Sequence, residues 1–172
     1  MSVREVDRGS EALFRRLDQR TGVRVGVIGS DAMQAHKERD ENGEEKSGDL
    51  TVIDVATKHE YGLGVPKRSF IRDYVDENEG RLKQYVRNVG KRIMAGESAE
   101  KAFNAFGVVV VGEIRTRISN HISPPNSQKT IDWKGSDTPL IGVTGQLWSS
   151  ITHAVDGTQP HLDGKRPPGV SG

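Results

Sequence analysis

The chain contains no cysteine among its 172 residues. That absence excludes disulfides, thiolate zinc sites and cysteine nucleophiles, and it fits assembly in a reducing cytosol. Long apolar runs are missing as well: the longest is Val108–Val111, whereas about 20 apolar residues are needed to span a bilayer. Residues Met1–Asp7 carry charges and lack the apolar core of a signal peptide. We therefore expect a soluble protein that stays in the compartment where it is made.

An excess of one charge sign is also absent. Lysine and arginine number 25 against 24 aspartate and glutamate residues, for a formal net charge of +1. Proteins that bind nucleic acid broadly have a basic excess, so this balance argues against that class. Aromatic residues make up only 5% of the chain, and glycine accounts for 20 residues. A composition with few aromatic residues and many glycines suits a subunit whose core is completed by contacts with neighbouring subunits. It suits an ordinary hydrophilic domain with long loops equally well.

The N-terminal third predicts one helix, two strands and an acidic loop. Ser10–Gln19 has an amphipathic helical pattern and begins at a serine suited to cap a helix. Val23–Val27 alternates apolar and polar residues, as a half-buried strand does. Asp31–Asp49 is rich in acidic residues and predicts an exposed loop or hairpin. Leu50–Val55 then predicts a second strand, and Ala56–Tyr61 a helical turn or short helix.

The middle of the chain predicts two long helices that pair antiparallel. Apolar residues recur at steps of three and four from Ile71 to Ile93, and a glycine follows shortly after. Ser98 is suited to cap the second helix, whose apolar face runs from Phe103 to Ile118. Gly107 and Gly112 each cost about 1 kcal/mol relative to alanine inside a helix. We expect them where another backbone packs closely.

The C-terminal region predicts a short helix, a strand and a tail. Two prolines at 124 and 125 end the helical region, and a polar, turn-rich stretch follows. Thr144 or Gly145 is suited to cap a helix of one or two turns, and Ile151–Val155 alternates as a strand does. Residues 157–172 hold little that can form a core. We predict an extended tail there.

Together these patterns predict an α+β fold, in which a small antiparallel sheet packs on one or two long helices. A single domain would cover residues 1–156, with residues 31–49 as an exposed loop or hairpin insertion. Residues 157–172 would form the extended C-terminal tail.

The sequence shows no catalytic set. His59 and Glu60 begin like a zinc-protease motif, but that motif needs a second histidine four residues after the first, where this chain has Leu63. No Gly-x-Ser-x-Gly elbow of a serine hydrolase is present. The other histidines are scattered without metal-ligand spacing: His36, His121, His153 and His161. We predict a protein that is not an enzyme and needs no cofactor or metal.

Charged residues nonetheless form local clusters. A basic group opens the first long helix and continues along it, which suits contact with DNA or with an acidic partner. Acidic residues intervene, however, and a mixed-charge helix face exposed to solvent explains the same pattern. The residues suited to a subunit interface are Lys67, Arg68, Arg72, Glu41, Glu44, Glu45 and Trp133.

Three segments carry a family resemblance through their order and spacing. His59–Gly62 is followed by Pro66–Arg72 at the entry to a long helix, and Thr144–Ile151 comes before the last strand. This arrangement resembles the neck and tail-completion proteins of lambdoid siphophages and the related virion-morphogenesis proteins of Mu-like phages. The likeness covers about Thr51 to Val155, and Ser69 stands where the family usually has proline. The residues that match are His59, Glu60, Tyr61, Gly62, Pro66, Phe70, Arg72, Thr144, Gly145 and Leu147.

The matching residues have expected scaffold roles. Tyr61 would anchor in the core, and Gly62 would permit a positive φ at a tight reversal. Phe70 would be the first core anchor of the long helix. The Thr144 hydroxyl would cap the short helix, and Leu147 would reach under the sheet.

The resemblance implies a structural virion protein at the head–tail junction. Its copies would form or join a ring that connects the head connector to the tail. Expected partners are other copies of itself, head–tail connector proteins, and tail tube or tail terminator proteins. Genomic DNA would pass through the lumen without sequence-specific contact, and no membrane is involved. The expected location is the virion, after assembly in the host cytoplasm.

Two alternatives remain. The first is a protein-binding module, directed at phage or host proteins, that does not enter the particle. The second is a metal-dependent hydrolase built from His59, Glu60, Asp54 and a distant histidine.

Overall fold

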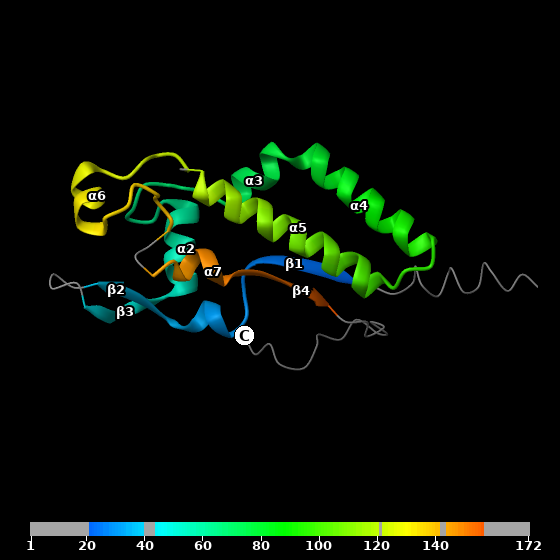
Figure 1. Ribbon diagram of the computed structural model, residues 1–172, viewed down its shortest axis with the longest axis horizontal. Helices are drawn as coiled ribbons and strands as arrows, with labels where there is room; N and C mark the ends of the chain where they lie inside the picture. The colour runs from blue at the N-terminus through cyan, green and yellow to red at the C-terminus, as the bar shows by residue number, and fades with distance from the viewer. Residues whose placement is uncertain (1–20, 40–43, 121, 142–143, 157–172) are drawn as a thin grey trace, which may run out of the picture.

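The computed structural model describes residues 21–39, 44–120, 122–141 and 144–156 (Figure 1). The predicted helix at Ser10–Gln19, the predicted tail at residues 157–172 and Glu41 lie outside the described residues. The predicted α+β class is confirmed, with small antiparallel sheets packed against helices. The strands form two separate two-stranded sheets rather than one.

The first sheet pairs strands from the two ends of the described chain. Strand β1 (Gly22–Val27) runs antiparallel to β4 (Ile151–Asp156), with Gly22 opposite Asp156 and Val27 opposite Ile151. Both strands were predicted from alternating apolar residues, and both are confirmed. Helix α5 packs on this sheet, as Figure 1 shows. One face is therefore buried while Arg24 and Asp156 pair on the exposed side.

The acidic stretch forms the second sheet. A short 3-10 helix, η1 (Ser30–Met33), leads into β2 (Ala35–Arg39), which pairs with β3 (Glu45–Thr51). Of the two predicted forms, the structure has the hairpin. The predicted strand at Leu50–Val55 is wrong, because β3 ends at Thr51 and helix α2 (Val52–Tyr61) begins at the next residue.

The early start of α2 has a local cause. The Thr51 hydroxyl accepts from the Asp54 backbone amide at 3.3 Å, and the Asp54 carboxylate accepts from the Thr51 amide at 2.9 Å. This reciprocal capping box satisfies two amides that a helix start leaves unpaired. The Thr51-x-x-Asp54 spacing therefore starts a helix within the segment for which a strand was predicted.

The first long helix is interrupted. The structure has α3 (Arg72–Glu77) and α4 (Glu79–Met94) in place of the continuous helix predicted from Ile71 to Ile93. Asn78 stands at the break, with φ −116° and ψ 17°, and its side-chain amide donates to the Tyr74 carbonyl at 2.8 Å. The bend lets α4 turn and lie along α5.

Helix α5 (Ala99–Ser119) lies at the centre of the fold, between α4 and the first sheet (Figure 1). The predicted Ser98 cap is confirmed, since its hydroxyl accepts from the Lys101 amide. A Cβ at Gly107 would lie 2.4 Å from a ring atom of His153, so this glycine permits close packing on β4. A Cβ at Gly112 would have no atom of a neighbouring element within 4 Å, so close packing does not require glycine there.

Two short helices complete the C-terminal part. Helix α6 (Gln128–Lys134) lies within the stretch that was predicted as turns and is capped by the Ser127 hydroxyl. Helix α7 (Gln146–Ser150) follows Gly145, which has φ 62°. The Thr144 hydroxyl makes no capping bond to α7 and is buried without a partner among the described residues. The predicted role of Thr144 is therefore wrong, whereas Gly145 does begin the helix.

The main core lies where α2, α3, α5, α7 and the first sheet meet. Phe70 and Leu147 are both buried there, as predicted. Glu113 adds a polar tie, because its carboxylate accepts from the Tyr74 and Tyr85 hydroxyls and pairs with Arg81. This group holds α3, α4 and α5 together. No described helix has the length and apolar character needed to cross a membrane.

Candidate functional site

The first two matching segments meet at one elbow, where α2 ends and α3 begins. Gly62 ends α2 in the left-handed conformation, with φ 75°, and its amide donates to the Lys58 carbonyl at 2.7 Å. A Cβ at Gly62 would lie only 3.0 Å from the Lys67 Cβ. The prediction of a positive φ is confirmed. Glycine serves here both for the backbone angle and for the close return of the chain.

Glu60 is the central residue of this elbow. Its buried carboxylate accepts from the backbone amides of Phe70 at 2.9 Å, Ile71 at 3.2 Å and Arg72 at 2.8 Å, which lead into the first turn of α3. The Ser69 hydroxyl donates to the same carboxylate at 2.7 Å. The unpaired amides at a helix start need acceptors, and a negative charge is favoured there. Glu60 thus caps α3 from another helix.

These bonds decide the charge state of Glu60. Burial opposes ionisation, but the Ser69 hydroxyl and the three amides together outweigh it and lower the pKa of Glu60 below its ordinary value. The carboxylate is therefore ionised at neutral pH. Ser69 contributes directly, because its hydroxyl donates to Glu60 and accepts from the Asp73 amide at 3.2 Å.

Arg68 ties the elbow to the loop before α6. Its backbone amide donates to the His59 carbonyl at 2.7 Å. Its guanidinium donates to the carbonyls of Pro124 at 2.7 Å and Pro125 at 3.1 Å. The side chain is only 6% exposed. The expectation that Arg68 lies in a subunit interface is therefore wrong, because its donors are used within the fold.

His59 is held neutral. Burial lowers its pKa to about 4, and the nearby cations Arg68 and Lys134 add to the shift. Its Nδ1 atom has no hydrogen-bond partner among the described residues. A neutral, half-buried imidazole between two cations is poorly suited to proton transfer at neutral pH, since its pKa lies well below that pH.

Tyr61 and Arg72 form the exposed side of the elbow. The Arg72 guanidinium lies 4.6 Å from the centroid of the Tyr61 ring, a cation–π contact. Tyr61 is 59% exposed. The expectation that it anchors in the core is wrong, because it lies on the outward face of α2 and stacks on Arg72 instead. Pro66 and Lys67 are exposed as well.

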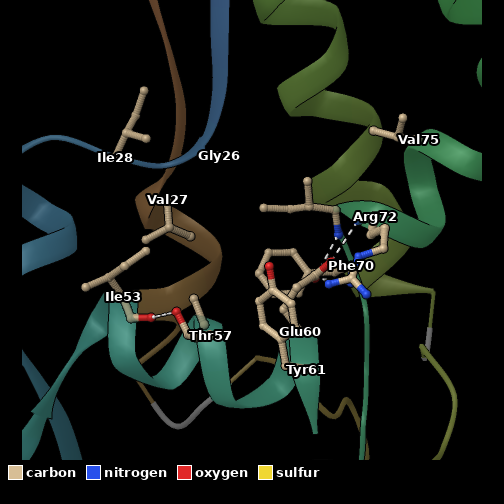
Figure 2. Close-up of a pocket in the computed structure, with 12 residues that line it drawn as sticks. Gly26, Val27, Ile28, Ile53, Thr57, Glu60, Tyr61, Phe70, Arg72 and Val75 are labelled. Atoms are coloured by element: carbon tan, nitrogen blue, oxygen red, sulfur yellow. Dashed lines mark hydrogen bonds between the residues drawn. The ribbon is translucent and has the colours of Figure 1, made fainter. Parts of the chain in front are cut away.

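A groove of about 500 Å³ opens beside this elbow. Figure 2 shows three sides: the end of β1, helix α2 and the start of α3. Glu60 lies at its base, with its carboxylate directed at the amides of α3. The groove is lined mainly by apolar side chains, and those that shape it are Val27, Ile53, Thr57, Tyr61, Ile71 and Val75.

The remaining residues of the predicted interface lie on other elements. Glu44 is exposed next to β3, and Glu45 is the first residue of that strand. Trp133 belongs to α6, while Lys67 and Arg72 belong to the elbow. Sequence reasoning missed the groove, although Ile53, Thr57 and Tyr61 stand at the helical spacing that would have placed them on one face.

The hydrolase alternative needs a metal-binding cluster, and the described residues do not form one. Asp54 bonds to Thr51 at the start of α2, and Glu60 is used by α3. Over the described ranges, no three histidine, aspartate or glutamate side chains come together as metal ligands. Comparison with protein-family models, with curated proteins and with solved structures finds no match for this chain.

Proposed function

We propose that this protein is a structural subunit of the head–tail junction of a tailed bacteriophage, where its copies form or join a ring. One observation carries the proposal. The polar groups of the matching segments are used to hold the elbow together: Glu60 caps α3, Ser69 supports it, and Arg68 binds a distant loop. Such use of Glu60, Ser69 and Arg68 fits a scaffold, because these side chains hold the chain in place.

The surface supports an assembled state. Large apolar side chains are strongly exposed on several elements, and such surface commonly marks protein–protein contact. The outer faces of α3, α4 and α5 all contribute. The exposed residues are Met33, Tyr61, Leu63, Val75, Val86, Met94, Val108 and Val109.

The proposed partners follow from a ring at the junction. They are neighbouring copies of this chain, the head–tail connector, and tail tube or tail terminator proteins. A closed ring repeats one heterologous contact by rotation, so each copy presents two different surfaces to its neighbours. The formal net charge of +1 fits a lumen that lets DNA pass without binding it tightly.

Particle composition and genetic removal test this proposal. Mass spectrometry of purified particles should detect the chain, and a phage that lacks its gene should accumulate heads and tails that do not join. Supplying the intact gene should restore infectious particles. Absence of the protein from purified particles would refute the proposal and favour a binding module that acts outside the particle.

A second test concerns the C-terminal residues. We expect residues 157–172 to reach a neighbouring subunit, because they are polar and too poor in apolar residues to form a core of their own. A phage that encodes the chain without these residues should join heads to tails poorly. Normal joining would show that they have no essential contact.

A further inference from the structure

A cluster of basic side chains lies where the elbow meets the segments around α6. Arg68 belongs to the elbow, Lys134 ends α6, and His59 belongs to the last turn of α2. None of the three forms an ion pair with another described residue. We propose that Arg68 and Lys134 bind a small tetrahedral dianion of the phosphate class.

Hydrogen bonds hold the two cations on adjoining segments of the chain. The Arg68 guanidinium donates to two proline carbonyls and, at 3.4 Å, to the Asn126 side chain. Asn126 in turn donates to the Asp137 carbonyl at 3.4 Å, which ties its loop to the segment that follows α6. The Lys134 ammonium donates to two carbonyls of that segment, at 2.6 Å and 3.0 Å. These contacts fix both cations within one region of the fold.

The positive charge of this region is not balanced by the described residues. The hydrogen-bond partners that they give to Arg68 and Lys134 are all neutral carbonyl oxygens. Arg68 is only 6% exposed, and Lys134 is half-buried. Charges taken out of water are normally paired with an opposite charge, because neutral partners satisfy the hydrogen bonds but leave the charge in place. An anion beside the two cations supplies that opposite charge.

The pKa values of the cluster show the effect of this unbalanced charge. Burial lowers the pKa of Lys134, and the nearby Arg68 lowers it further. Burial also lowers the pKa of Arg68. The pKa of His59 is lowered by burial first, and then by Arg68, Lys134 and His36. No carboxylate of the described residues acts in the opposite direction on any of these three groups.

Both cations keep donors that a ligand can use. An ammonium group has three N–H donors, and Lys134 uses two of them on carbonyls. The Nη1 atom of Arg68 donates to no other described residue. Lys134 and His59 are half-buried rather than buried, so the cluster reaches solvent on their side. A small anion fits such a place, whereas a duplex needs a broad exposed surface.

The number of charges favours a dianion. Arg68 and Lys134 together carry two positive charges, and a phosphate group carries about −1.5 to −2 near neutral pH. A guanidinium and an ammonium are also the side-chain groups that most often bind phosphate oxygens. A carboxylate, or one phosphodiester of a nucleic acid, has a single negative charge and balances only one of the two cations.

Titration calorimetry of the full chain with inorganic phosphate tests this site. At about pH 8, where phosphate is mostly a dianion, and with chloride holding the ionic strength constant, we expect saturable binding of one phosphate per chain. Lys134→Gln removes one charge and keeps an amide donor, and it should weaken binding at least about tenfold. Lys129→Gln is the matched control, because Lys129 is exposed on the same helix and should leave the affinity unchanged.

A second measurement does not depend on how well the variant folds. Phosphate should raise the melting temperature of the native protein above its value in chloride at equal ionic strength, because a ligand that binds only the folded state stabilises it. Sulfate, also a tetrahedral dianion, should act similarly. Acetate, with one charge, should bind at least about tenfold more weakly.

Several outcomes overturn the site. They are phosphate that binds and stabilises no better than chloride, equal weakening by the two lysine variants, and acetate that binds as tightly as phosphate. Duplex DNA whose binding is lost in Lys134→Gln alone overturns it too, and assigns the cluster to a nucleic-acid backbone. None of these results depends on whether the chain is found in purified particles, so the proposed function is tested separately.

Discussion

Replacing Glu60 by glutamine tests the central contact of the elbow with minimal change of shape. In the native protein both carboxylate oxygens accept two hydrogen bonds each, three from backbone amides and one from the Ser69 hydroxyl. Glutamine keeps one acceptor oxygen, but its other terminal atom is an amide nitrogen that can only donate. That nitrogen would face two hydrogen-bond donors of the native site and could not pair with them. The variant therefore loses two charge-assisted bonds at a buried position.

The expected loss follows from these bonds. Hydrogen bonds to a charged group contribute about 1.5–3 kcal/mol each, and a buried donor left without a partner costs a similar amount. Two lost bonds predict a decrease of about 3 kcal/mol in the free energy of unfolding. For a chain of this length, that corresponds to a melting temperature lower by about 6–12 °C.

Urea denaturation of the native protein and the Glu60→Gln variant measures this difference. The pKa of Glu60 also fixes the direction in which this stability difference changes with pH. The folded pKa of Glu60 lies below the ordinary 4.5, so the contribution is fully present above that pH and is lost as the pH falls through the folded value. The stability gap between the two proteins should therefore narrow below about pH 4.5.

Glu79→Gln is the matched control, because Glu79 forms an exposed pair with Lys83 one helical turn away. Exposed pairs contribute little to stability, so this change should be nearly neutral. A Glu60→Gln variant as stable as the control at pH 7 would refute the assignment of Glu60 as the cap of α3.

Three further predictions concern the same fold. Since the pKa of His59 is lowered to about 4 from 6.5, the unfolded chain binds a proton that the folded chain does not. Stability should fall by about 1–2 kcal/mol from pH 7 to pH 5 in urea titrations, and His59→Gln should flatten that slope. Arg68→Ala should cost about 2 kcal/mol through its lost carbonyl bonds, whereas Lys67→Ala at the exposed neighbour should be nearly neutral by the same assay. Gly112→Ala should raise the melting temperature by stabilising α5 about 0.5–1 kcal/mol, while Gly107→Ala should lower it through a clash with the histidine ring beneath. Equal losses of stability for Arg68→Ala and Lys67→Ala, or equal melting temperatures for Gly112→Ala and Gly107→Ala, would contradict the packing described.

Much of the fold follows from short-range patterns in the sequence. Alternating valines predicted β1, and Ser98 predicted where α5 begins, because both signals act over a few residues. Phe70 and Leu147 were also placed correctly in the core. The start of α2 was missed, although its capping pair, Thr51 and Asp54, is visible in the sequence.

The contacts of the elbow required the three-dimensional structure. Glu60 bonds to amides ten to twelve residues away, and Arg68 reaches carbonyls more than fifty residues away. Neither pairing leaves a periodic signal in one sequence. A charged residue is usually exposed, so Arg68 was assigned to the surface, although its carbonyl partners allow it to be buried. An aromatic residue suggests a core position, yet Tyr61 is exposed on α2, where one face of its ring packs against the Arg72 guanidinium.

A reconstruction of the intact particle tests the central claim most directly. We predict repeated copies of this chain around the tail axis, between the head connector and the tail tube. A particle whose junction is complete without any density for this chain would contradict it.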